Sequence, residues 1–265
     1  MDKQLIHSLP IPLTEKPLLR SFLEQNRALY AYGLGNLELL ESEVVSYNGV
    51  FVDNQLDGVA LLWRGEVTPV LVLCANETAA HALLTDEAMP HQVHVMTPAN
   101  LQPALETHFS TLEVDRLWRM AVTAPEFERA APRAGLRRLT VSDLDAVNAL
   151  YRAEHIIMSA QRLTEGVFYG FEDKNQQLIA IAGTHAVAPS VNIGIVGSVY
   201  TTPEARGQGL ATLTTGAVTE ELFRLGIDLV ALNVLQTNTP AIRAYQKLGY
   251  RIHAPIIKGI AYKEQ

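Results

Sequence analysis

The stretch RGQGLA, residues 206–211, contains residue types that suit the binding of a phosphate group. Two glycines stand one residue apart behind Arg206, and the apolar spacing that follows predicts a helix from residue 210. Main-chain amides at a helix N-terminus are unpaired and lie at the positive end of the helix dipole. Because Gly207 and Gly209 lack a Cβ, a diphosphate could approach the main chain closely. The stretch therefore predicts an anion site, to which Arg206 could add an ionic contact.

Two other phosphate-binding patterns fit this stretch less well. A P-loop requires Gly-x-x-x-x-Gly-Lys-Ser/Thr, and the sequence contains no such run. A Rossmann fingerprint requires a third glycine where this chain has Thr212, and its acidic residue, here Asp228, stands at the start of the next strand rather than at its end. The loop also follows three consecutive strands instead of a βα unit, which disfavours a dinucleotide-binding fold.

The predicted elements around the loop place it between a strand and a long helix. Three strands separated by polar, turn-forming residues predict an antiparallel meander, over residues 167–172, 178–187 and 193–202. The loop is followed by a helix ended by Gly226, a strand, a helix capped by Thr239 and a pair of strands, over residues 210–225, 228–234, 239–249 and 250–263. A short strand, a helix from about Ser142 and a second helical stretch precede the meander, over residues 136–139, 142–155 and 156–166.

The order TTPEARGQGLA, helix, strand, NTPAIRAYQKLGY resembles the GNAT acetyltransferase superfamily over roughly residues 135–260. The first signature of that family is Gln/Arg-x-x-Gly-x-Gly/Ala, carried here by Arg206, Gly209 and Ala211. The second is Asn-x-x-Ala-x-x-x-Tyr with a downstream Gly-aromatic pair, carried here by Asn238, Ala241, Tyr245, Gly249 and Tyr250. The resemblance implies an α/β (α+β) fold: a mixed, mostly antiparallel twisted sheet flanked by helices.

The resemblance also implies acetyl-CoA as cosubstrate and a role for each matching residue. The pyrophosphate would lie on main-chain amides of the loop and first helical turn, here Gly207, Gln208, Gly209, Leu210, Ala211 and Thr212. The pantetheine arm would pair like an extra strand with the splayed fourth strand, here Val199, Tyr200 and Thr201. Asn238 would bind the pantetheine or position the last helix, and Tyr245 would face the thioester sulfur. The other interpretation of Tyr245 is a core aromatic of an amphipathic helix.

The implied reaction is direct transfer of an acetyl or similarly small acyl group from CoA to a primary amine. The amine must lose a proton, an oxyanion must form and a thiolate must leave, and backbone amides of the splayed strand can hold the oxyanion. A free thiol has a pKa of about 8.5 and tyrosine one of about 10. We therefore expect Tyr245 to donate a hydrogen bond and to give up its proton late.

The general base is where the sequence departs from the family pattern. Many relatives have a Glu on the fifth strand, but the matching residue is Asn233, which cannot accept a proton. The candidates that the sequence offers are His185, Glu172 and a water held by Tyr200, and an amine of low intrinsic pKa needs no base. We expect His185 to be the catalytic candidate among them, although a histidine at a strand end is more often a surface or packing residue.

The first half of the chain resembles a degenerate second copy of the same topology. Its predicted order, helices, three strands, helix, strand, helix and strand, is that of tandem-domain GNAT members and of glycine N-acyltransferase-like proteins. The segment ANETAA, residues 75–80, takes the place of the phosphate loop, but it lacks glycine and Glu77 would repel a diphosphate. We expect residues 1–130 to be structural or to form a substrate wall, and residues 131–265 to be catalytic, with a linker over 124–135.

Composition narrows the classes of partner. The net charge of −7 disfavours a nucleic-acid binder. The excess of acidic residues lies in the first 130 residues, which contain 17 acidic and 8 basic residues. No apolar run reaches the roughly 20 residues that span a bilayer, and the N-terminus lacks a signal-peptide core, so we expect a cytoplasmic protein.

The cysteine and histidine residues do not predict a metal site. Cys74 lies in a predicted buried strand, and His91 and His94 fall on opposite faces of another predicted strand. Oligomeric state stays open, a homodimer included.

Two other functions remain open from the residues. The missing base allows a catalytically weak acyl-CoA-binding regulator on the same fold. A nucleotide-dependent oxidoreductase would instead require NAD to bind at the glycine loop.

Overall fold

The computed structural model describes residues 8–65, 67–86, 89–154 and 156–263 of the chain. Contacts between Cα atoms divide them into two compact units. Unit 1 contains the described residues up to Arg119 and those from Ala254 onward, and unit 2 contains Met120–His253. The expected boundary at residue 130 therefore differs from the observed division, which also assigns the last strand of the chain largely to unit 1.

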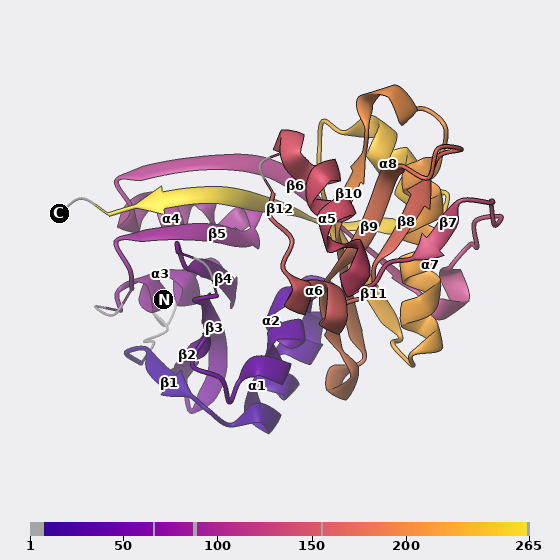
Figure 1. Cartoon of the computed structure of the whole chain (residues 1–265). Coiled ribbons are helices and arrows are strands. Elements are labelled where there is room, and N and C mark those ends of the chain that lie inside the picture. The colour runs from indigo at the N-terminus through magenta and orange to yellow at the C-terminus, as the bar shows by residue number, and fades with distance from the viewer. Residues whose placement is uncertain (1–7, 66, 87–88, 155, 264–265) are drawn as a thin grey trace. The chain divides into compact units, whose positions relative to one another are not determined.

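Unit 2 contains the elements that carry the predicted site (Figure 1). They are β7 (Leu136–Arg138), α5 (Leu144–Tyr151), α6 (Ala160–Glu165), β8 (Tyr169–Glu172), β9 (Leu178–Ala188), β10 (Ile193–Thr201), α7 (Leu210–Arg224), β11 (Leu229–Leu235) and α8 (Thr239–Gln246). Strands β8, β9 and β10 are successive antiparallel neighbours, as the meander pattern predicted. Strand β7 pairs antiparallel with β8, and β10 pairs with β11 in parallel. The glycine loop lies, as predicted, between a strand and a long helix.

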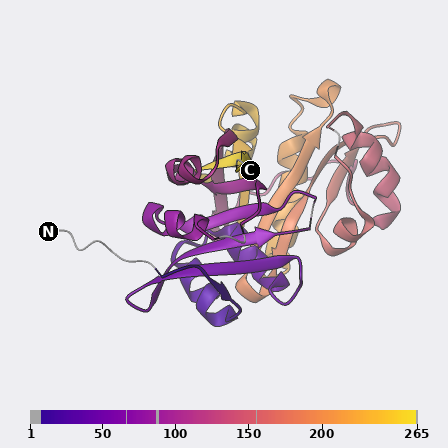
Figure 2. The ribbon, with the colours of Figure 1, turned by 90° about the vertical axis from the view of Figure 1, so that its left-hand side faces the viewer.

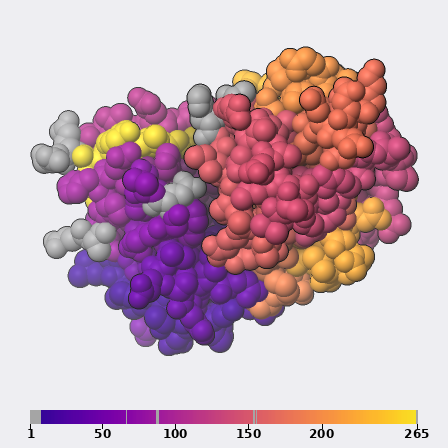
Figure 3. Space-filling view, in the orientation of Figure 1, coloured from indigo at the N-terminus to yellow at the C-terminus, as the bar shows by residue number. Residues whose placement is uncertain are grey.

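Helices cover both faces of the unit 2 sheet. Side chains of α5 and α6 pack on one face in a core that includes Phe168 and Ile181. Leu210 and Leu213 of α7 pack in a second core that includes Ala180. Ala180 and Ile181 are neighbours on β9, so the two cores lie on opposite faces of the sheet. Figure 3, in the orientation of Figure 1, shows the surface that α5 and α6 form over unit 2.

Two predictions about the end of the chain were wrong. The N-cap of α8 is Asn238, whose side-chain oxygen accepts a hydrogen bond from Ala241 N, and Thr239 is already helical. Residues 250–263 form a single long strand, β12 (Arg251–Tyr262), in place of the expected pair. Pro255 and Gly259 are the residues in this run that favour turns, and the strand continues through both.

Unit 1 repeats the element order of unit 2 (Figure 2). Its elements are β1 (Ile11–Leu13), α1 (Lys16–Leu23), α2 (Ala31–Gly35), β2 (Val45–Val52), β3 (Gln55–Trp63), β4 (Val70–Ala75), α3 (Glu77–Leu84), β5 (Gln92–Pro98), α4 (Gln102–His108) and β6 (Thr111–Thr123). Cys74 on β4 is buried, as predicted, and burial raises the pKa of its thiol to about 12. Among the described residues, no helix is both long and apolar enough to cross a membrane.

The last strand of the second repeat, β12, lies largely in unit 1, whereas β6 belongs to unit 1 up to Arg119 and to unit 2 from Met120. The strand order in unit 1 is β1-β2-β3-β4-β5-β12-β6, and in unit 2 it is β6-β11-β10-β9-β8-β7. In unit 1, β12 pairs antiparallel with β5 from Ile256 to Tyr262. On its other side an added Cβ at Gly259 would lie 1.8 Å from the Glu113 carbonyl oxygen, so only glycine allows β6 to approach there.

Candidate active site

The glycine loop has the backbone conformation that its sequence requires. Gly207 has φ +79° and Gly209 has φ +77°, both in the left-handed region that glycine adopts without strain. A Cβ added at either residue would meet nothing within 4 Å. The glycines are therefore required for backbone conformation rather than by crowding, and the main chain beside them stays accessible to a ligand.

The amides that follow the loop are unpaired at the start of α7. The first helical hydrogen bond runs from Leu213 N to Gly209 O at 3.0 Å. The amides of Leu210, Ala211 and Thr212 therefore have no acceptor within the helix, and Gly209 supplies no side-chain cap. With the helix dipole, these donors form a site for an anionic group.

Two arginines hold the loop in place. Arg206 donates from Nε to the Thr201 carbonyl oxygen at 3.2 Å, and Arg133 donates from Nη1 to the Gln208 carbonyl oxygen at 3.0 Å. The Arg133 guanidinium also stacks 5.0 Å from the centroid of the Phe171 ring. Both guanidinium groups are exposed and add positive charge next to the loop. Sequence analysis missed Arg133, because nothing in the sequence connects it to a loop 75 residues away.

Strands β10 and β11 diverge next to the loop. Their parallel pairing covers Ile193–Val196 and Leu229–Leu232, yet β10 continues to Thr201 and β11 to Leu235. The second half of β10 stays paired with β9 on its other side. The predicted residues Val199, Tyr200 and Thr201 lie on this part of β10, whose edge β11 no longer covers, although the Thr201 carbonyl oxygen already accepts from Arg206.

The Thr201 hydroxyl supports a ligand at this edge. Oγ1 of Thr201 is buried and has no hydrogen-bond partner in the described part of the chain. A buried hydroxyl without a partner is unfavourable by roughly 1–3 kcal/mol, so such groups in native proteins usually meet a ligand or water. CoA, with a polar pantetheine arm and a diphosphate, fits both this edge and the amides of α7.

A bulge in β9 shapes the sheet beside the point where β10 and β11 diverge. Between the pairs Ile195↔Ala186 and Val196↔Thr184, β9 has one extra residue, His185. The exposed His185 ring lies against Gly197, where an added Cβ would be 2.2 Å from its Nε2. The His185 ring therefore lies over Gly197, one residue beyond Val196, the last β10 residue paired with β11.

Asn238 is the N-cap of α8, and Tyr245 lies within that helix. Asn238 is exposed and caps the helix, which supports its expected positioning role. Tyr245 is 5% exposed, its ring centroid lies 6.1 Å from that of Tyr250, and its hydroxyl forms no hydrogen bond to the described residues. Burial raises the pKa of Tyr245 to about 12, so its hydroxyl stays protonated at neutral pH.

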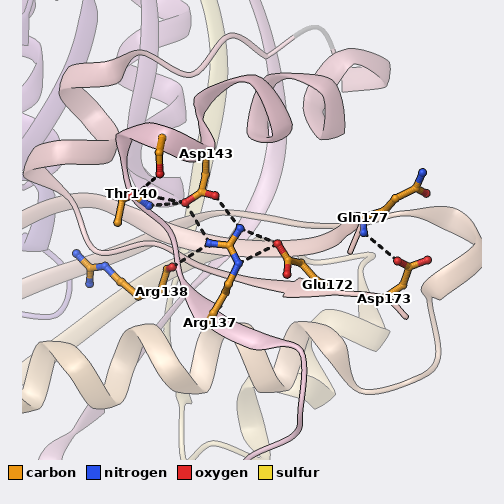
Figure 4. A network of polar contacts seen from close by, with 8 residues as sticks. Arg137, Arg138, Thr140, Asp143, Glu172, Asp173 and Gln177 are labelled. Carbon is orange, nitrogen blue, oxygen red and sulfur yellow. Dashed lines mark hydrogen bonds and ion pairs between the residues drawn. The ribbon is translucent and has the colours of Figure 1, made fainter. Parts of the chain in front are cut away.

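Glu172, the second candidate base, is bound in an ion-pair network (Figure 4). Arg137 donates to its Oε1 from Nε at 2.8 Å and from Nη2 at 2.6 Å, and to Asp143 from Nη1 and Nη2. The guanidinium therefore occupies Oε1 of Glu172. Asn233 follows Leu232, the last β11 residue paired with β10, so it lies where the two strands diverge.

The corresponding region of unit 1 is closed. Strands β4 and β5 also stop pairing early, after Leu71 and Val95, but Oγ1 of Thr97 then donates to the Leu73 carbonyl oxygen at 3.3 Å. At the start of α3, Asn76 accepts a hydrogen bond from Ala79 N at 2.8 Å. Side chains of unit 1 thus use groups that in unit 2 are free for a ligand. In the described part of the chain, no three His, Cys, Asp or Glu residues gather as metal ligands.

Comparisons with known proteins agree with this geometry. Residues 135–250 match the family model "Acetyltransferase (GNAT) family". A solved Drosophila protein is similar over 96% of this chain and 98% of its own, at 12% identity and TM-score 0.71. A tandem GNAT protein from the clavulanic acid biosynthesis pathway is similar over 99% of both chains, at 14% identity and TM-score 0.58. A GNAT-family acetyltransferase structure from Novosphingobium aromaticivorans covers 73% of this chain and 84% of its own, at 23% identity and TM-score 0.55. A search of curated proteins gave no match.

These comparisons bear out the expected fold and family. Residues 135–250 are a GNAT acetyltransferase domain, and the chain has a tandem GNAT-like architecture of mixed, mostly antiparallel sheet flanked by helices. Acyl transfer from acetyl-CoA to an acceptor is the chemistry of that family.

Proposed function

We propose, from the GNAT acetyltransferase domain over residues 135–250, that this protein is an N-acyltransferase that moves an acetyl or similarly small acyl group from CoA to a primary amine. One observation carries the proposal: the open edge of β10 leads directly into the uncapped, glycine-rich start of α7. An extended pantetheine arm suits the first feature, and a diphosphate suits the second.

The reaction needs no covalent enzyme intermediate. The lone pair of the amine attacks the thioester carbon, and the carbonyl electrons move to oxygen. The resulting oxyanion collapses, the C–S bond breaks, and the CoA thiolate leaves while the amine gives up a proton. Backbone amides at the open edge of β10 would stabilise the oxyanion, a contribution worth several kcal/mol in other enzymes, roughly 3–4 for one donor.

Tyr245 would donate a hydrogen bond to the departing sulfur. Its pKa of about 12 lies well above the roughly 8.5 of a free thiol, so complete proton transfer is unfavourable by about 5 kcal/mol. Of the two candidate bases, His185 has its ring over Gly197, just beyond the pairing of β10 with β11, whereas Glu172 is bound by Arg137. We therefore assign the base role to His185.

The test is calorimetric titration of acetyl-CoA into matched glycine variants. Gly209→Ala places a side chain at φ +77° in the proposed diphosphate site, and we expect the affinity for acetyl-CoA to fall at least tenfold. Gly226→Ala is the control: its φ is +87°, it also has nothing within 4 Å of an added Cβ, and it lies at the opposite end of α7. Both variants carry similar backbone strain, about 1–2 kcal/mol, so equal losses of affinity would contradict the proposal.

A second function is favoured by Asn233 at the position of the family's Glu. A catalytically weak acyl-CoA-binding regulator would bind acetyl-CoA without turnover. If acetyl-CoA raises the melting temperature but no acceptor in a broad amine panel is acylated, the regulator is the better description. Stabilisation by NAD, without any by CoA, would instead indicate the oxidoreductase.

A further inference from the structure

Strand β10 has a bulge at Ser198, one residue beyond Gly197. The pairs Gly197↔Gly183 and Tyr200↔Ile181 enclose three steps on β10 and two on β9, so β10 has one extra residue. Ser198 has φ +53°, in the left-handed region that a non-glycine residue adopts at a cost. Surrounding contacts must therefore hold the bulge in this conformation.

Tyr151, at the end of α5, supplies the main contact. Its hydroxyl donates a short hydrogen bond to the Ser198 carbonyl oxygen. The side chain is 1% exposed, belongs to the core beneath α5 and α6, and lies with its ring centroid 6.0 Å from that of Tyr200. Burial raises the pKa of Tyr151 above its usual range, so the hydroxyl remains a donor at any physiological pH. Arg162 of α6 adds a weaker contact from Nη2 to the Ser198 hydroxyl at 3.4 Å.

This hydrogen bond also fixes the amide that follows. The peptide between Ser198 and Val199 is trans, as are all those described, so its N–H points opposite to its C=O. Since the carbonyl of Ser198 points to Tyr151, the N–H of Val199 points away from α5. Val199 lies on the part of β10 that no longer pairs with β11, so no β11 carbonyl accepts from this donor.

We propose that Tyr151 is a positioning residue for acyl transfer, which aims the Val199 N–H at the carbonyl oxygen of the bound thioester. The proposal rests on the proposed function, because it requires an acyl-CoA at the open edge of β10. Tyr151 itself does not touch the reacting atoms; it acts through the peptide unit. Without its hydroxyl, Ser198 is free to relax from φ +53° and the Val199 donor loses its direction.

The test compares two ligands that differ only in the carbonyl group. Acetyl-CoA has the thioester oxygen, whereas the thioether S-ethyl-CoA has none. In the wild type we expect acetyl-CoA to bind about fivefold more tightly, the equivalent of one net hydrogen bond. In Tyr151→Phe we expect this preference to fall close to one, with the affinity for S-ethyl-CoA unchanged.

Tyr47→Phe is the matched control. The Tyr47 hydroxyl is equally buried and donates to the Gly33 carbonyl oxygen at 2.7 Å, but in unit 1. Its removal should cost similar stability and leave the ligand preference unchanged. A wild type without preference, or an unchanged preference in Tyr151→Phe, would overturn the proposal. Failure of the wild type to bind either ligand would instead refute the proposed function.

A measurement on the wild type guards against a Tyr151→Phe variant that does not fold. With 15N-labelled valine, the amide proton resonance of Val199 should move downfield when acetyl-CoA binds and stay near its original position with S-ethyl-CoA. Equal shifts with the two ligands would contradict a hydrogen bond from Val199 to the carbonyl oxygen.

Discussion

At the scale of single residues, the hydroxyl of Tyr245 is the group most directly tied to the chemistry. Tyr245→Phe keeps the ring in its packing beside Tyr250 and removes a hydroxyl that bonds to no described residue. We expect kcat to fall about 10- to 100-fold, in the range of lost general-acid or hydrogen-bond assistance. The KM for acetyl-CoA and the melting temperature should change little. An equally fast variant would leave Tyr245 with a packing role only.

At the residue scale, the sequence predicted the conformation of the glycine loop. Gly207 and Gly209 carry that information in their own chemistry, because left-handed backbone favours glycine. The N-cap of α8 was predicted at Thr239, since threonine also caps helices, but the cap is Asn238. Tyr151 and Arg133 carry no such information: a tyrosine near a helix end and an arginine in a linker are ordinary. Their roles depend on contacts with Ser198 and Gln208, which only the folded chain brings near.

At the scale of elements, the Arg137 network joins the starts of β7 and α5 to the end of β8 (Figure 4). Arg137→Met would leave the carboxylates of Asp143 and Glu172 close together without a cation. Because the Arg137 side chain is 40% exposed, solvent weakens the pairs, and we expect a loss of about 1–2 kcal/mol, or a few degrees in melting temperature.

The stability difference between the wild type and Arg137→Met should depend on pH. The hydrogen bond from Arg137 lowers the pKa of Asp143, so the stabilisation is complete above about pH 4 and is lost as the pH falls through the folded-state pKa. The deficit of the variant should therefore shrink in acid. Arg224→Met is the control, since its pair with Glu221 is more exposed and lies within α7. A comparable loss in the control would remove any special role for Arg137.

Element types and order followed from periodicity, but irregularities within strands did not. The strands β8, β9 and β10 begin and end within two residues of the prediction. The bulges at His185 and Ser198 were missed, although Gly197 inside a strand is a recognised sign of one. A bulge depends on the register of two strands, and a single strand's pattern does not reveal it.

At the scale of the whole molecule, unit 1 contains a group whose titration affects stability. His108 of α4 lies with Nε2 3.3 Å from Nδ1 of His81 on α3. Burial, then the positive charges of His81 and Lys263, lower the pKa of His108. The unfolded chain therefore binds a proton near pH 6.5 that the folded chain takes up only at lower pH. We expect the melting temperature to fall as the pH drops through this window.

His108→Gln should reduce this acid sensitivity, because the variant lacks the imidazole whose pKa is lowered in the folded chain. His91→Gln is the control, since it removes an exposed histidine outside the α3–α4 pair. Melting curves between pH 5 and 8 measure the effect, and an identical slope in all three proteins would refute it.

The division of the chain was the least predictable feature. The linker-like composition of residues 124–135 suggested a cut at 130, because charge and periodicity change there. Which strand pairs with which is a long-range property, however, and the placement of β12 between β5 and β6 leaves no local trace in the sequence. The core of each unit, by contrast, follows from apolar alternation along its own strands.

The placement of β12 has a consequence during synthesis. Ribosomes make the chain from its N-terminus, so unit 1 lacks the strand that separates β5 from β6 until translation has passed Ala254. The edge of β5 that pairs with β12 therefore stays exposed while the intervening residues are synthesised. An exposed strand edge promotes aggregation, so we expect chaperones to be needed most during this interval. A premature stop codon just before Ala254 would accordingly damage the half of the protein that was made first.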